Sequence, residues 1–91
     1  MIQFSLHSDV QVDDSRSFYM VYNMTCANTL YGIECYKAGT DFSKPLNYAH
    51  VKDITSDEQF TVNLIKKLAA GNVMPIHIGD VVSDCLPYGD F

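Results

Sequence analysis

The sequence predicts a single α+β domain, in which a four-stranded antiparallel sheet is followed by one long and one short helix packed on one face. Apolar and polar side chains alternate at the start of the chain, as in Ile2, Phe4 and Leu6 against their neighbours, which is the period of a half-buried strand. After Thr55 the apolar residues recur at helical spacing instead. Strands followed by helices are typical of α+β proteins, and 91 residues suffice for one domain, residues 1–91.

Four segments have the composition of strands, and polar or turn-forming residues separate them. Residues 8–17 are polar and predict a loop, although Val10 and Val12 leave room for a longer first strand. A tight turn is expected at 27–29, because Asn28 tolerates positive φ. The expected strands are residues 2–7, 18–26, 30–37 and 48–54.

A long helix is expected over residues 56–70, ended by Gly71 in a left-handed turn. Overlapping capping boxes are predicted at its start: Thr55 with Glu58, and Ser56 with Gln59. A shorter helix, about 77–86, follows Pro75, which suits the beginning of a helix. The expected core consists of apolar side chains from both halves: Phe4, Leu6, Ile33, Val51, Phe60, Leu64, Leu68, Val81 and Cys85.

Charge and composition exclude several classes of protein. Six Lys and Arg against eleven Asp and Glu give a net charge of −5, which argues against direct binding of nucleic acid or an anionic membrane. Acidic residues outnumber basic ones in the sheet half, so its aromatic side chains do not predict an RNA-binding sheet. No apolar run approaches the ~20 residues of a transmembrane helix.

Cysteine usage predicts a cytoplasmic protein. Cys26, Cys35 and Cys85 are odd in number and lack a CxxC spacing, so we expect buried free thiols rather than disulfides or a zinc site. The first residues have neither the basic start nor the long apolar stretch of a secretion signal.

The three histidines are candidate site residues, and no pair of them has a metal-ligand spacing. His50 and His77 are the best pair, because the last helix must pack near the sheet, and either Asp53 or Asp80 would add a carboxylate to a small polar site. They define the alternative function, a small-ligand or metal site with possible enzymatic activity. No nucleophile motif or phosphate-binding loop is present, so we expect no catalytic residue, no metal and no cofactor.

Tyrosine is the more informative residue type. Helices on one face leave the other face of the sheet uncovered, and tyrosine combines a large apolar contact area with a polar tip. The expected interaction surface is Tyr19, Tyr22, Tyr36 and Tyr48. We therefore expect a non-catalytic interaction or regulatory module that binds a partner protein or a second copy of itself; ordinary cross-strand packing of the tyrosines is the competing interpretation. A lesser alternative is a phage-type acidic inhibitor of a nucleic-acid-binding protein.

Several short segments also point to a family. They are Tyr31-Gly32-Ile33-Glu34, Val51-Lys52-Asp53-Ile54-Thr55, Pro75-Ile76-His77-Ile78 and Asp80-Val81-Val82. In this order, over about residues 31–86, the chain resembles a family of short bacterial proteins known as a domain of unknown function and common in anaerobic Gram-positive bacteria. The resemblance implies a bacterial cytosolic protein and supplies no activity.

Overall fold

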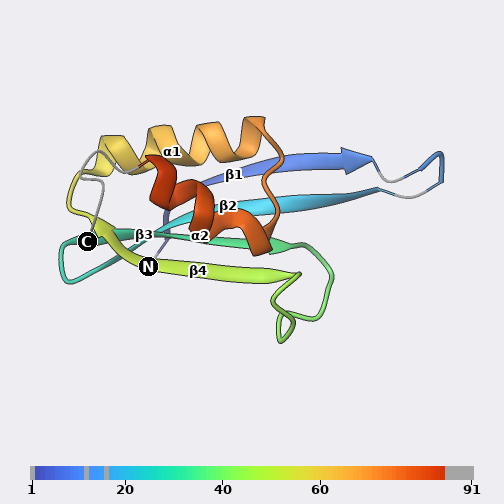
Figure 1. Ribbon diagram of the computed structural model, residues 1–91, viewed down its shortest axis with the longest axis horizontal. Coiled ribbons are helices and arrows are strands. Elements are labelled where there is room, and N and C mark those ends of the chain that lie inside the picture. The colour runs from blue at the N-terminus through green and yellow to red at the C-terminus, as the bar shows by residue number, and fades with distance from the viewer. Residues whose placement is uncertain (1, 12, 16, 86–91) are drawn as a thin grey trace.

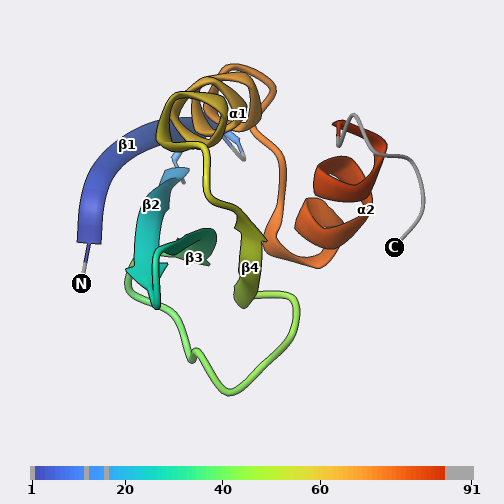
Figure 2. The ribbon, with the colours of Figure 1, turned by 90° about the vertical axis from the view of Figure 1, so that its left-hand side faces the viewer.

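The computed structural model confirms the predicted fold class: four antiparallel strands followed by two helices. It describes residues 2–11, 13–15 and 17–85. The strands β1 (Ile2–Gln11), β2 (Ser17–Ala27), β3 (Leu30–Lys37) and β4 (Tyr48–Thr55) form one sheet in the order β1-β2-β3-β4. The helices α1 (Glu58–Ala70) and α2 (Pro75–Cys85) lie on the same face of this sheet (Figure 1, Figure 2). Among the described residues, no helix is long and apolar enough to cross a membrane.

The first strand is longer than expected. The mostly polar stretch 8–17 predicts a loop, with a longer strand left open by Val10 and Val12; residues 8–11 continue β1 as far as Gln11, which pairs with Ser17. The alternation of buried and exposed positions persists there, with Ser8 buried between exposed His7 and Asp9. The β1–β2 hairpin consequently extends beyond the helices at one end of the molecule (Figure 1).

The turn between β2 and β3 also differs from the expectation. It is a two-residue turn formed by Asn28 (φ 53°) and Thr29 (φ 66°), so Ala27 pairs with Leu30. The expected turn of three residues, 27–29, would shift the pairing by one position. Because side chains alternate between the faces, such a shift changes which residues stand beside one another on each face.

The N-cap of α1 differs from the predicted one, and the C-cap is Gly71 as predicted but in a different conformation. Asp57 is the N-cap, and its carboxylate accepts a hydrogen bond from the Phe60 amide at 3.1 Å. The predicted capping boxes are therefore wrong; Thr55 instead accepts a hydrogen bond from the Asp57 amide. At the other end Gly71 has negative φ, and Asn72 (φ 51°) adopts the left-handed conformation. α2 starts at Pro75, two residues earlier than expected, and Leu86 lies outside the described residues.

The core lies between the sheet and the helices. Among the expected core residues, Ile33, Leu64 and Leu68 are fully buried or nearly so, and the others are partly buried against them. The expectation omitted the central strand, although β2 supplies the largest buried side chains, Met20, Tyr22 and Met24. The three cysteines are free thiols, but only Cys35 is buried; Cys26 and Cys85, which were also expected to be buried, are partly exposed.

Candidate functional site: the open face of the sheet

The face of the sheet opposite the helices carries most of the predicted interaction residues. Val21 is aligned with His7 on one side and with Tyr36 on the other, and Tyr36 is aligned with Tyr48. Tyr19 lies two residues before Val21 in β2, so the two side chains point to the same face. We call this surface the open face of the sheet.

Tyr22 does not belong to the open face. It has no exposed surface and packs with Met20 and Met24 under the helices. Successive residues of a strand point to opposite faces of the sheet. Tyr19 and Tyr22 are three residues apart, so their side chains lie on opposite faces. The structure therefore corrects the predicted surface by removing Tyr22.

The sequence interpretation missed Phe42, which completes an aromatic patch. Phe42 comes from the β3–β4 loop, and its ring centroid lies 4.7 Å from that of Tyr36 and 5.7 Å from that of Tyr48. Tyr19 packs edge-on against His7 at 5.5 Å. Tyr19 and Phe42 remain 46% and 45% exposed. An aromatic residue between the loop residues Asp41 and Ser43 was the available signal. We define the aromatic patch as Tyr19, Tyr36, Phe42 and Tyr48.

Next to the aromatic patch is a hydrogen-bonded polar network centred on Glu34. Asn23 Nδ2 and Tyr48 Oη donate to the two carboxylate oxygens of Glu34 at 3.0 and 2.7 Å. Burial by itself raises the pKa of Glu34, but these two hydrogen bonds and nearby His50 outweigh it and lower this pKa below its ordinary value. The bond to Glu34, together with burial, raises the pKa of Tyr48 to about 12. The carboxylate of Glu34 is thus held ionised in the middle of the open face.

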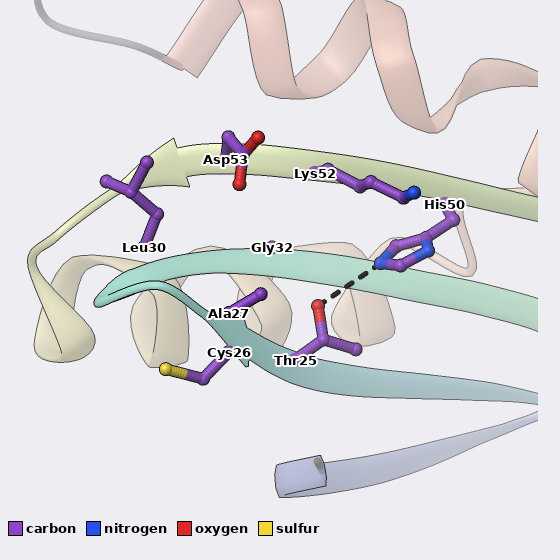
Figure 3. Close-up of a pocket in the computed structure, with 8 residues that line it drawn as sticks. All are labelled: Thr25, Cys26, Ala27, Leu30, Gly32, His50, Lys52 and Asp53. Atoms are coloured by element: carbon purple, nitrogen blue, oxygen red, sulfur yellow. Dashed lines mark hydrogen bonds between the residues drawn. The ribbon is translucent and has the colours of Figure 1, made fainter.

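Beyond this network lies a pocket of about 300 Å³, between β2, β3 and β4. His50 Nε2 and Thr25 Oγ1 are 3.2 Å apart and hydrogen-bonded across Gly32 (Figure 3). Lys52 and Asp53 also line the pocket. His50 and Asp53 are the two lining residues that the sequence suggests as site residues. The sequence does not suggest the others, because their proximity depends on the exact register of the three strands.

The three polar candidates from the sequence are not brought together. His50 lines the pocket on the open face, whereas His77 and Asp80 are exposed on α2, which packs on the other face. Across residues 2–11, 13–15 and 17–85, no group of three or more His, Cys, Asp or Glu side chains is arranged to hold a metal ion.

Comparison with known proteins places this small α+β chain in a family. The chain belongs to the "Family of unknown function (DUF6514)", whose model matches residues 2–87. This match covers the strands as well as the helices, a longer stretch than the segments that carried the resemblance. Neither the curated proteins nor the solved structures give a significant match.

Proposed function

We propose that the protein is a non-catalytic interaction module of the bacterial cytoplasm that binds a partner protein through the aromatic patch. One observation carries the proposal: both helices cover the same face of the sheet, and the opposite face keeps Tyr19 and Phe42 about half exposed. Exposed aromatic clusters are typical of interfaces, where tyrosine gains contact area with little loss of side-chain entropy.

Charge favours a basic partner over a second copy of the chain. Asp9 is aligned with Tyr19, and Asp41 precedes Phe42, so carboxylates adjoin the patch. Hydrogen bonds from the Ser43 amide and hydroxyl lower the pKa of Asp41, which keeps it ionised. Two copies meeting at this surface would bring these acids together, with a net charge of −5 on each chain. A partner segment with apolar and Lys or Arg side chains fits the aromatic rings and the acids alike.

The cytoplasmic and bacterial assignments rest on other observations. Three free cysteines, one of them fully buried, suit a reducing compartment. The bacterial origin rests on the resemblance of the segments within residues 31–86.

Photocrosslinking followed by measured binding tests the proposal. A photoreactive amino acid is placed at Phe42 in cells, and at Ile76, an equally exposed apolar position on α2, as the matched control. We expect a cross-linked protein from position 42 only. The purified partner should bind in a salt-dependent manner, and the Tyr19→Ser, Phe42→Ser double variant should bind at least ~10-fold more weakly, as expected for loss of aromatic anchors.

Two results would overturn the proposal. One is a purified partner that binds the Tyr19→Ser, Phe42→Ser double variant as tightly as it binds the Ile76→Ser variant. The other is a stable dimer in sedimentation that Phe42→Ser dissociates, since this would assign the patch to self-association.

A further inference from the structure

The pocket on the open face is set apart from the aromatic patch and lies toward the Asn28–Thr29 turn. It is bounded by β2, β3 and β4, with Thr25 on one side of Gly32 and His50 on the other (Figure 3). Its volume of about 300 Å³ is at the lower end of the range for small-molecule sites.

Gly32 creates the floor of this pocket. A Cβ atom at this position would lie 2.6 Å from the carbonyl oxygen of Val51 and 3.0 Å from Thr25 Oγ1, too close for any other residue without a backbone shift. The middle strand therefore carries no side chain here, while its two neighbours do. The β3–β4 register also shifts at this point, where Asp53 has φ 54°.

The polar groups of the pocket are of opposite charge and are not paired with each other. Lys52 extends along β4 toward His50, whereas Asp53 lies nearer Leu30 (Figure 3). The side chains of Lys52 and Asp53 make no hydrogen bond or ion pair with any residue that the structure describes. Two adjacent charged residues thus present their charges to the same cavity, and both are exposed to solvent.

Apolar atoms complete the lining. Ala27, Leu30 and Cys26 form the part of the wall near the β2–β3 turn. A ligand that satisfies the whole pocket therefore has an anionic group, a cationic group and an apolar body.

We propose that this pocket binds a small zwitterionic amino acid. Its carboxylate contacts Lys52, His50 and the Thr25 hydroxyl, its ammonium group contacts Asp53, and its apolar carbons contact Leu30 and Ala27. A phosphate group fits less well, because its nearly double negative charge would lie close to Asp53 in a protein of net charge −5. This site is independent of the aromatic patch, so its failure would leave the proposed interaction module intact.

Titration of the ¹⁵N-labelled protein followed by NMR tests the site. Leucine represents α-amino acids, and 6-aminohexanoate represents amino acids with separated charges; both are added to about 10 mM, which covers millimolar dissociation constants. We expect one of the two to give saturable shifts at Thr25, Gly32 and His50. The half-ligands 4-methylpentanoate and 3-methylbutylamine should bind at least ~10-fold more weakly, since each lacks one charged hydrogen bond.

Charge-removing variants identify the residues that hold the ligand. Lys52→Met keeps the aliphatic chain, and Asp53→Asn keeps a residue that tolerates positive φ, so both should fold. Each should weaken binding at least ~10-fold, whereas Lys66→Met, at an exposed position of α1, should not change it.

The proposal is overturned if neither amino acid gives saturable shifts, or if Lys52→Met binds with unchanged affinity. It is equally overturned if a half-ligand or inorganic phosphate binds as tightly as the amino acid.

Discussion

The hydroxyl of Tyr22 donates a hydrogen bond to the carbonyl oxygen of Val73, 2.9 Å away. This bond joins the central strand β2 to the segment between α1 and α2, and Cys35 Sγ lies 4.0 Å from the same oxygen. Both side chains are completely buried. The position of α2 over the sheet therefore depends on a polar contact inside an otherwise apolar core.

Removal of this hydroxyl should destabilise the protein. Tyr22→Phe leaves the partly buried Val73 carbonyl without its main donor, and we expect the free energy of unfolding to fall by ~1–3 kcal/mol. Urea denaturation measures the change. The control is Tyr36→Phe, whose hydroxyl makes no hydrogen bond within the described residues and whose effect should be below ~0.5 kcal/mol. Equal effects of the two substitutions would contradict the structural role of the Tyr22–Val73 bond.

The sequence predicted the fold because periodicity reports which side chains are buried. The change of period at Thr55 located α1 to within two residues, and Ile33, Leu64 and Leu68 were correctly placed in the core. Composition did not reveal that the mostly polar residues 8–11 extend β1, because strand pairing there compensates for the polar side chains.

The candidate site was less predictable, because it depends on register rather than on composition. Asn23, Glu34 and His50 are aligned across three strands only when the β2–β3 turn has two residues. A three-residue turn would align Asn23 with Ile33 instead. The choice of Tyr22 failed for a related reason, since tyrosine content does not say which face of a strand is covered.

Glu34 should contribute to the pH dependence of stability. Its pKa is lower in the folded protein than its ordinary value of 4.5, so its contribution is fully present above pH 4.5 and is lost as the pH falls through the folded pKa. We expect Glu34→Gln to be less stable than the wild type at pH 7 and to lose less stability between pH 5 and about 3. Urea denaturation at each pH gives both curves, and parallel curves would show that Glu34 is not linked to folding.

Cys35 should resist alkylation in the folded protein, unlike Cys26. Burial raises the pKa of Cys35 from 9.0 to about 12, so little thiolate exists at pH 8, and its sulfur is inaccessible. Cys26 is partly exposed. We expect iodoacetamide to modify Cys26 first and Cys35 only in urea, as read by peptide mass spectrometry. Modification of both residues at one rate without urea would show that the core around Tyr22 opens readily.

The β2–β3 turn offers a stabilising substitution. Thr29 has φ 66°, a left-handed conformation that disfavours β-branched residues, and its partner Asn28 has φ 53°. Asn-Gly is the preferred pair for such a turn, so Thr29→Gly should relieve ~1 kcal/mol of backbone strain. Part of this gain is offset by the greater freedom of glycine in the unfolded chain, which leaves a net stabilisation of about 0.5 kcal/mol. Thermal and urea unfolding measure it, with Thr40→Gly in the exposed β3–β4 loop as the control. A lower melting temperature for Thr29→Gly would mean that the turn does not hold residue 29 in the left-handed region in solution.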